Sequence, residues 1–434
     1  MSDRACFPAS PYTGLFARHG AMQPLAHDPL VALWAGEMAP SAGRAHPLPV
    51  GGAGWSAQAA EQAGIGEAIE RLQPYRLPRD QIKTAAFVSF PGNEPALDPA
   101  RLILFHAQQY QQPGFPFSPL TSATPCDWVC MRDAASGAPC WVPADVVYLF
   151  ARGAHQFCPG LSTGFSCGRP GDPVLLRGLQ EIIERDALVG AWWGRYALTE
   201  CPPAELWAAL DAELVRRVQR PNLDYHFYKI DSPFHPQVTL CTVAGENRGG
   251  FCFALGSACR TGERASYTKS LLEAIQSLVY ARSLKEEVRL GQRQPPLVPK
   301  DFADHAVYYS LHPEKLRNTP LQRAPRRTAS PAVAPFPDPI AAAKIEPKAE
   351  PKAENPAAEL QRITQRLGPE RPVLFRAMTP PGIAQERSEL YVLRVLVPGL
   401  QPLHGDDRFP QLGGPLWAPR RLADFAALPP HPFP

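Results

Sequence analysis

Three stretches of the chain share one pattern, in which a helical, amphipathic background carries an acid and, three positions later, a second acid or an amide. The stretches predict helices over residues 56–72, 172–193 and 264–284, with Ser56 as the N-cap of the first. Residues three apart project from one face of a helix, and the apolar residues of each stretch fall on the other side. Each helix can therefore bury an apolar face and present two oxygen ligands at its polar edge. The three pairs are Glu67 and Glu70, Glu181 and Glu184, and Glu273 and Gln276.

The five carboxylates of these pairs would repel one another strongly if they met without cations among them. Carboxylate oxygens are hard ligands that suit Mg²⁺, which commonly bridges the phosphates of a nucleotide. A single pair is more simply a solvated helix face, but three pairs, two of them followed directly by Arg71 or Arg185, favour a shared site. The sequence has no GxxxxGK[ST] loop and no GxGxxG opening a helix, so a nucleotide would be bound without a P-loop. It has no GxSxG or HExxH either, which gives conventional hydrolase chemistry little support.

The remaining pattern predicts an α/β chain of the mixed α+β kind, with one main domain, because strands and helices alternate without clean βαβ repeats. Proline accounts for 52 of 434 residues, about 12% against a typical ~5%, which requires many turns and at least one linker. We expect a domain order of N-terminal extension, core, Pro/Ala/Lys/Glu-rich linker or insertion, and C-terminal part of the core, over residues 1–50, 51–317, 318–357 and 358–434. Strands are expected over residues 84–90, 100–107, 126–132, 140–150, 223–230, 237–244 and 250–256.

Composition excludes several other classes of protein. The net charge of +3 is too small to indicate a nucleic-acid partner or binding to an anionic membrane surface. No apolar run reaches the ~18 residues of a membrane span, and the N-terminus lacks an apolar signal region, so we expect a cytoplasmic protein. Its ten cysteines are then expected to be small buried hydrophobes rather than disulfides. The cluster of Cys126, Cys130 and Cys140 has neither a CxxC nor a nearby histidine pair, which disfavours zinc.

The segments around the acidic pairs resemble the YcaO family. GGAGWSAQAAEQAGIGEAIERL resembles its opening segment, STGFSCGRPGDPVLLRGLQEIIERDALVGAWW resembles its Ser-Asn-Gly loop and following helix, and GSACRTGERASYTKSLLEAIQS resembles its later Glu/Gln segment. Within the family, VLRVLVPGLQPLHGDDRF and a PxPxP ending resemble the cyclodehydratases of thiazole/oxazole-modified peptide pathways. A floppy proline-rich tail would be the simpler interpretation of the ending alone.

This resemblance implies an ATP-dependent cyclodehydratase that forms thiazoline or oxazoline rings in a ribosomally made precursor peptide. A Cys, Ser or Thr side chain attacks the preceding carbonyl, ATP phosphorylates the resulting oxyanion, and phosphate leaves. The implied Mg²⁺ and phosphate ligands are Glu67, Glu70, Glu181, Glu184 and Glu273. The implied contacts to nucleotide or phosphate are Ser162, Lys269 and Gln276, with Arg71 and Arg185 either there or as partners of the carboxylates. The implied active-site tail residues are Pro430, Pro432 and Pro434.

The sequence departs from the family pattern at three places. Ala53 replaces the lysine of the family's GGKG, Lys269 stands where arginine is usual, and Ala63 or Gly64 replaces a serine. The first loss removes a positive charge, so a non-catalytic subunit that binds a peptide or partner remains an alternative to an enzyme. Thioamide or amidine formation by the same activation step is another.

The resemblance also implies partners. We expect a precursor peptide rich in Cys, Ser and Thr and, because the chain starts about where the YcaO-like part begins, a separate leader-binding protein. A flavin-dependent dehydrogenase partner and a homodimer stay open. Because the tail has few large apolar side chains, we expect it to add little to global stability.

Overall fold

Three antiparallel sheets and the helices between them organise the chain. The computed structural model describes residues 15–39, 48–75, 81–149, 156–247, 249–327, 355–378, 390–418 and 420–433. These residues form one mixed α+β domain, as the sequence predicts. Among them, no helix combines the length and the hydropathy needed to cross a bilayer.

The sheets combine strands from distant parts of the chain. The first has the order β1-β2-β3, the second β11-β10-β9-β8, and the third β4-β5-β12-β13-β7 with β6 also paired to β5. The first contains β1 (Phe16–Met22), β2 (Ala32–Met38) and β3 (Leu48–Gly54). The second contains β8 (Leu198–Cys201), β9 (Leu223–Ile230), β10 (Val238–Asn247) and β11 (Gly250–Cys259). The third contains β4 (Lys83–Ala85), β5 (Cys126–Asp133), β6 (Pro139–Pro143), β7 (Phe165–Gly168), β12 (Leu374–Ala377) and β13 (Tyr391–Leu396).

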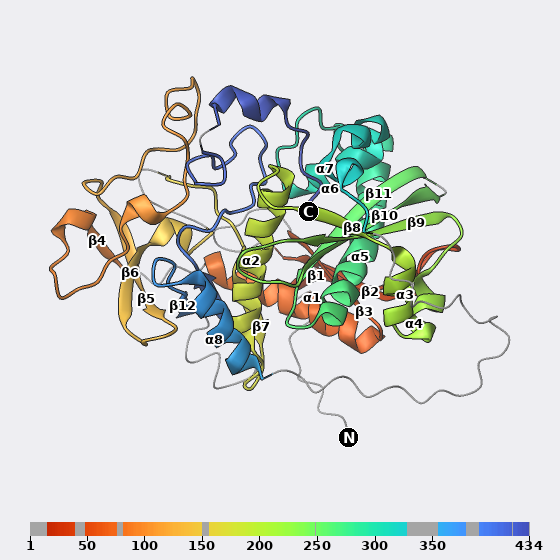
Figure 1. The fold of residues 1–434 in the computed structure, drawn as a ribbon, viewed down its shortest axis with the longest axis horizontal. Coiled ribbons are helices and arrows are strands. Elements are labelled where there is room, and N and C mark those ends of the chain that lie inside the picture. The colour runs from red at the N-terminus through yellow and green to blue at the C-terminus, as the bar shows by residue number, and fades with distance from the viewer. Residues whose placement is uncertain are drawn as a thin grey trace.

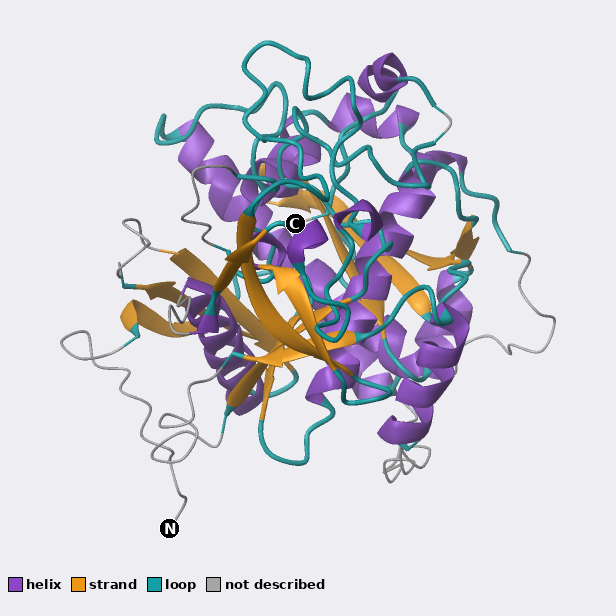
Figure 2. Cartoon of the chain, turned by 90° about the vertical axis from the view of Figure 1, so that its left-hand side faces the viewer, coloured by secondary structure: helices purple, strands orange, loops and turns teal. Residues whose placement is uncertain are grey.

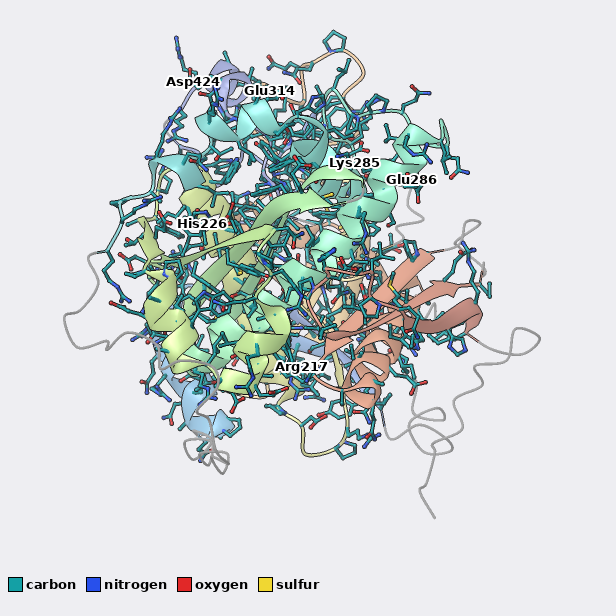
Figure 3. All side chains as sticks on the ribbon, turned by 90° about the vertical axis from the view of Figure 1, so that its right-hand side faces the viewer. Arg217, His226, Lys285, Glu286, Glu314 and Asp424 are labelled. Carbon is teal, nitrogen blue, oxygen red and sulfur yellow. The ribbon has the colours of Figure 1, made fainter. Side chains whose placement is uncertain are left out.

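The three helices predicted to carry the acidic pairs are present. They are α1 (Ala57–Leu72), α2 (Val174–Trp192) and α5 (Glu263–Arg289). Figure 1 shows α2 near the middle of the molecule, between strands of the third sheet and those of the second. The other α-helices are α3 (Pro203–Ala209), α4 (Ala212–Val218), α6 (Phe302–Leu311), α7 (Pro320–Arg323) and α8 (Pro356–Leu367). His226 of β9 and Glu286 of α5 lie on the outer side of the second sheet and its helix (Figure 3).

Local chemistry places α1 and α5 against their strands. The Ser56 hydroxyl caps α1 by accepting from the Ala59 amide at 3.2 Å, as expected. A Cβ at Gly52 would lie 2.0 Å from the carbonyl oxygen of Ala60, so only glycine lets β3 approach α1 this closely. A Cβ at Gly256 would likewise lie 2.2 Å from the backbone nitrogen of Ala274, which fixes β11 on α5. These contacts bring the acidic edges of two helices to the strands that complete the site.

The strand predicted over residues 100–107 is wrong. Pro99–Arg101 form a 3-10 turn, and Ile103, Leu104 and Phe105 are buried in an extended stretch outside any sheet. Their backbone is satisfied by another loop, since the Gly413 amide donates to Leu104 O at 3.0 Å. An apolar run can thus be buried against a loop instead of a strand, and periodicity does not distinguish the two.

The predicted domain boundaries stay predictions. Strand β3 crosses the boundary at residue 50 and pairs with β2 from the predicted N-terminal extension. In the predicted linker, α7 and the ion pairs from Arg326 to Glu200 and from Arg327 to Glu205 belong to the described structure. Residues 328–354 lie outside it.

Candidate functional site

The five predicted carboxylates form a row that runs from α1 across α2 to α5. The negative charges of Glu67 and Glu181 raise the pKa of Glu70, that of Glu184 raises the pKa of Glu181, and that of Glu273 raises the pKa of Glu184. In all three residues burial is the largest cause of the shift. For Glu70 the pKa rises from 4.5 to about 8. The helices therefore meet at their acidic edges, as the repeated pattern predicts.

Backbone amides from two strands orient the carboxylates of α1. Oε2 of Glu67 accepts from the Gly51 amide of β3 at 2.8 Å, and Oε1 of Glu70 accepts from the Cys167 amide of β7 at 2.6 Å. Arg71 donates to the other oxygen of Glu67 at 2.9 Å. Oε2 of Glu70 has no hydrogen-bond partner among the described residues. This oxygen can therefore serve as a cation ligand without breaking an existing bond.

The carboxylates of α2 are held in the same manner. Oε2 of Glu181 accepts from the Gly164 amide at 3.2 Å. Glu184 is buried and accepts from the Cys259 amide of β11 at 3.0 Å and from the Ser257 hydroxyl at 2.5 Å. Glu184 thus links α2 to the strand that packs on α5, so its charge is fixed more tightly than that of a surface acid.

The predicted cations pair with their own helices. Arg71 contacts Glu67, Arg185 lies 4.0 Å from Glu181, and Lys269 lies 3.0 Å from Glu273. All three pairs have i,i+4 spacing. The positive charges therefore partly offset the negative charge of the row, and Arg71 of α1 also faces Glu181 of α2.

The remaining predicted polar contacts lie around the row. A Cβ at Gly51 would be 2.9 Å from the side-chain nitrogen of Gln276, so the amide of α5 lies against β3 beside Glu67. Ser162 lies in the loop before β7, and its carbonyl oxygen accepts from the Phe165 amide at 3.1 Å. Neither side chain has a hydrogen-bond partner among the described residues, so both are available to a ligand.

Sequence reasoning missed a buried arginine behind the row. Arg394 of β13 is 5% exposed, its charge faces Glu181, and its guanidinium lies 4.4 Å from the ring of Phe165. It donates to the carbonyls of Leu161 at 3.1 Å and of Thr163, so it fixes the loop that carries Ser162. Burial lowers the pKa of Arg394 from 12.5 to about 10. The sequence contains a sign of this buried arginine, because Arg394 interrupts the otherwise apolar strand YVLRVL.

The C-terminal tail enters the interior beside α2. Figures 1 and 2, from two perpendicular directions, both place the end of the chain near the middle of the molecule. Pro432 is buried, Pro430 is half-buried, and Pro434 lies outside the described residues. Phe433 is 1% exposed and packs edge-on against Trp192 of α2 at 5.5 Å. The structure differs here from the expectation that the tail adds little stability, because one fully buried ring is a large contribution.

Ala53 occupies an apolar environment. It pairs with Leu33 across β2 and β3, and its methyl group packs with Trp55 against the core cluster that contains Leu271 and Ile275 of α5. The position therefore contributes packing to this cluster.

The donor set fits Mg²⁺. The ligands are hard oxygens, and burial followed by repulsion from neighbouring carboxylates raises the pKa values of Glu70, Glu181 and Glu184; a cation among them would relieve the repulsion. Within the described residues no three His, Cys, Asp or Glu side chains form a ready metal cage. Mg²⁺ usually takes one or two carboxylates and completes its coordination with phosphate and water.

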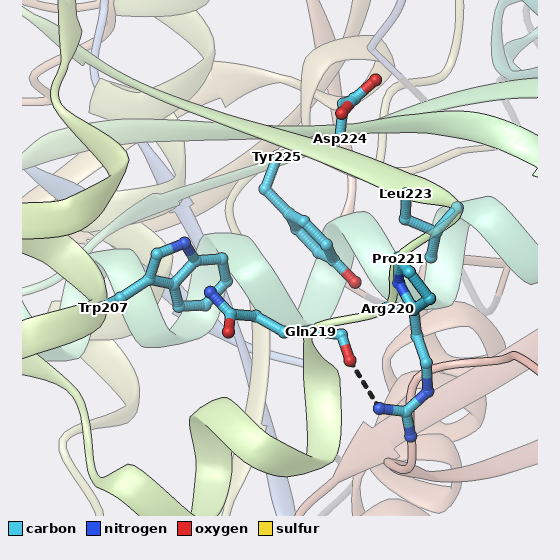
Figure 4. Close-up of a pocket in the computed structure, with 7 residues that line it drawn as sticks. All are labelled: Trp207, Gln219, Arg220, Pro221, Leu223, Asp224 and Tyr225. Carbon is cyan, nitrogen blue, oxygen red and sulfur yellow. Dashed lines mark hydrogen bonds between the residues drawn. The ribbon is translucent and has the colours of Figure 1, made fainter. Parts of the chain in front are cut away.

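A surface cavity of about 420 Å³ lies elsewhere, beside β9 (Figure 4). Trp207 and Tyr225 form its wall, and Arg220 uses its guanidinium on the carbonyls of Asp28 and Gln219. The cavity includes none of the predicted site residues.

Comparison with known proteins supports the resemblance seen in the sequence. The family model described as "YcaO cyclodehydratase, ATP-ad Mg2+-binding" matches residues 51–401. Comparison with curated proteins finds no match.

Solved structures share the fold. The YcaO protein of Methanopyrus kandleri, solved with AMPPCP and Mg²⁺, has a TM-score of 0.55 at 16% identity, over 88% of this chain and 85% of that one. A heterocyclase in complex with substrate and cofactor has a TM-score of 0.66 at 18% identity, over 98% of this chain and 55% of that one. The E. coli microcin synthetase complex McbBCD with pro-MccB17 bound has a TM-score of 0.56 at 13% identity, over 96% of both chains. The chain thus spans little more than half the length of the heterocyclase.

Proposed function

Because this chain belongs to the YcaO family, we propose that it is an ATP-dependent cyclodehydratase that forms azoline rings in a precursor peptide. The observation that carries the proposal is the row of five carboxylates on three helices, in which burial and neighbouring carboxylates raise the pKa values of Glu70, Glu181 and Glu184. Such a row is costly to a fold unless a cation and its phosphates complete it. The description of the family as ATP- and Mg²⁺-binding, and the AMPPCP and Mg²⁺ in the Methanopyrus kandleri structure, support this ligand.

In the proposed reaction, a thiol or hydroxyl of the peptide adds to the preceding carbonyl carbon and loses its proton. The resulting oxyanion attacks the γ-phosphorus of ATP, and the bond to the ADP oxygen breaks. This addition has already closed the five-membered ring. The amide proton then leaves, the carbon–oxygen bond breaks with release of phosphate, and a carbon–nitrogen double bond forms within the ring. The peptide thereby loses the atoms of one water per ring. Converting the amide oxygen to phosphate replaces a poor leaving group with a good one.

The residues of this chain would mainly position ATP and the peptide and stabilise the negative charge of the phosphates. Glu67, Glu70, Glu181, Glu184 and Glu273 would hold Mg²⁺, which neutralises phosphate charge when bound. Backbone amides of β3, β7 and β11 direct three of these carboxylates, and the Gly164 amide in the loop before β7 directs Glu181. Ser162, Lys269 and Gln276 would contact the nucleotide. Arg71 and Arg185, which pair with Glu67 and Glu181 in this structure, would either contact the phosphates or remain partners of these carboxylates.

The tail and the partners belong to the same proposal. Pro430, Pro432 and Pro434 would place the end of the chain beside the reacting peptide, and Phe433 anchors that end against α2. A precursor peptide rich in Cys, Ser and Thr and a separate leader-binding protein are proposed partners. The McbBCD complex with pro-MccB17, which combines several proteins and a peptide, supports such an assembly.

Ala53 favours a second candidate function, a non-catalytic subunit that binds a peptide or a partner. Its methyl group lies in an apolar cluster, so the chain lacks at this position the charge that the family pattern has. In an active enzyme Lys269, Arg71 and Arg185 would have to supply the positive charge around the phosphates. Thioamide or amidine formation would use the same phosphorylation with another nucleophile.

The decisive experiment combines ATP turnover with mass spectrometry of a precursor peptide encoded beside this chain. We expect Mg²⁺-dependent ATP hydrolysis stimulated by the peptide and a loss of about one water mass per ring. Glu184→Gln and Glu273→Gln should abolish both while the protein stays folded, because a lost carboxylate weakens Mg²⁺ binding. Glu286→Gln is the matched control, since Glu286 lies on α5 but pairs only with Arg289 at the surface.

The outcomes separate the candidates. Wild-type turnover in both folded variants would show that these are ordinary helix acids. Peptide binding by the wild-type protein without any ATP turnover would favour the non-catalytic subunit. Peptide-stimulated turnover without loss of water mass would favour another YcaO-type activation.

A further inference from the structure

The C-terminal tail cannot be held by ordinary backbone pairing. Residues 429–433 read Pro-Pro-His-Pro-Phe, and proline has no amide hydrogen. Only His431 and Phe433 can donate from the backbone, so neither a strand ladder nor a helix can fix the segment. The position of the tail must therefore come from side chains that reach its carbonyl oxygens.

Three side chains do so, on three successive carbonyls. The indole nitrogen of Trp192 donates to Pro429 O at 2.7 Å, and the Tyr309 hydroxyl donates to Pro430 O at 2.6 Å. Nδ1 of His305 donates to His431 O at 2.7 Å. Trp192 ends α2, while His305 and Tyr309 lie one helical turn apart on α6. Because every residue of the tail has a carbonyl oxygen, these three donors fix the path of the tail, while contacts specific to one side chain must fix which residue lies where.

The ring of His431 completes the arrangement. It stacks on His305 with ring centres 3.7 Å apart and 5° between the planes, and its Nε2 donates to His404 O at 2.8 Å. Nδ1 of His431 accepts from the Phe433 amide at 3.3 Å. The Phe433 amide and the Nε2–H of His431 are thus both used as donors, and the two hydrogen bonds of the His431 ring require its neutral form with the proton on Nε2.

The same helix connects the tail to the carboxylate row. Arg185 lies on α2 between Glu181, its i,i+4 partner, and the tail, and its charge contributes to lowering the pKa of His431. Trp192 follows two helical turns later on the same helix. The distance between the tail and the row is therefore set by α2 together with the three donors.

We propose that Trp192, His305 and Tyr309 are positioning residues that hold the C-terminal tail in place for ring formation. The inference rests on the proposed cyclodehydratase function, in which the tail acts near the reacting peptide. The three residues touch neither the row nor the nucleotide contacts described above. Their loss should therefore lower the rate of ring formation and leave Mg²⁺–ATP binding unchanged.

Matched variants test the donors one at a time. Tyr309→Phe removes only a hydroxyl, and Tyr308→Phe is its control, since the neighbouring Tyr308 hydroxyl accepts from Lys315 and does not contact the tail. His305→Asn keeps a donor near the position of Nδ1, which bonds to the His431 carbonyl, whereas the amide of His305→Gln lies too far away. Both variants lose the stacking on His431, so the stacking does not distinguish them. The Asn variant should therefore rescue what the Gln variant loses.

Two measurements on the full chain decide the proposal. We expect Tyr309→Phe and His305→Gln to lower the kcat of ring formation about 5- to 10-fold, the scale of one lost hydrogen bond, with an unchanged KM for ATP. We also expect the amides of residues 428–433 to exchange faster in Tyr309→Phe and His305→Gln than in the controls Tyr308→Phe and His305→Asn, as measured by mass spectrometry. Exchange or ring formation equal to the controls would overturn the proposal. If the wild-type chain forms no rings, the proposed function fails, and amide exchange alone decides whether the donors hold the tail.

Discussion

Removing the charge of Glu70 should stabilise the unliganded protein at alkaline pH. The pKa of this carboxyl rises from 4.5 to about 8, first through burial and then through the charge of Glu181. In Glu70→Gln the side chain can still accept from the Cys167 amide, as Oε1 of Glu70 does at 2.6 Å. The substitution thus removes the charge and keeps the contact that orients the side chain.

The size and sign of the effect follow from this pKa. Below pH 4.5 the carboxyl is protonated in both the folded and the unfolded chain. As the pH rises toward 8 the unfolded chain ionises first, so the free energy of unfolding falls through this window and the loss is complete above it. The shift of about 3.5 units corresponds to about 5 kcal/mol at about 1.36 kcal/mol per unit. Solvent around this half-buried side chain reduces the value, and we expect about 2 to 3 kcal/mol.

Urea unfolding at pH 5.5 and 8.5, with EDTA present, measures this directly. Glu70→Gln should gain stability over the wild type at pH 8.5 and little at pH 5.5. Glu61→Gln is the control, since Glu61 is an exposed residue of the same helix. Added Mg²⁺ should restore more stability to the wild type than to Glu70→Gln at pH 8.5. A Glu70→Gln protein no more stable than Glu61→Gln at pH 8.5 would refute the idea that the row stores repulsion.

Two further changes test the tail and the predicted linker. Phe433→Ala should lower the free energy of unfolding by about 3 kcal/mol in urea titrations, because the ring is 1% exposed and packs on Trp192; a loss below 1 kcal/mol would contradict its burial. Replacing residues 328–354 with a short Gly/Ser linker should leave the melting temperature and ATP binding nearly unchanged, because their composition favours no packed core. The replacement keeps Arg326 and Arg327, which form ion pairs with Glu200 and Glu205. A large fall in melting temperature would show that the replaced segment packs against the rest of the protein.

The sequence predicts the helices of the site because their information is local. Spacing of three residues places Glu181 and Glu184 on one edge of α2 in any helix of this sequence. The residues that orient them are not local. The amides that donate to Glu70 and Glu184 belong to Cys167 and Cys259, 97 and 75 positions away in the chain. A backbone amide has no sequence signature, so these partners appear only once the strands are placed.

The tail shows the same division. Its proline spacing predicts extended backbone, and the resemblance implies a place at the active site. Its burial depends on Trp192 and Tyr309, whose contacts with residues 429 and 430 span 237 and 121 positions. The number of large apolar side chains is a poor guide to how much the tail contributes to stability. The tail has only one such side chain, Phe433, but this ring is completely buried and anchors the tail.

Helix α2 joins these two parts of the molecule through a third contact. Asp186, directly after Arg185, accepts from the Gln401 amide at 2.8 Å and from the Tyr196 hydroxyl at 3.0 Å. Gln401 lies in the segment that leads from β13 to the tail, so the segment is fixed to α2 before the chain returns to Trp192. Burial raises the pKa of Asp186 to about 6, and both hydrogen bonds favour its ionised form. The sequence Glu184-Arg185-Asp186 therefore serves three purposes on one turn: the acid belongs to the row, the arginine faces both the row and the tail, and the aspartate fixes the chain that delivers the tail.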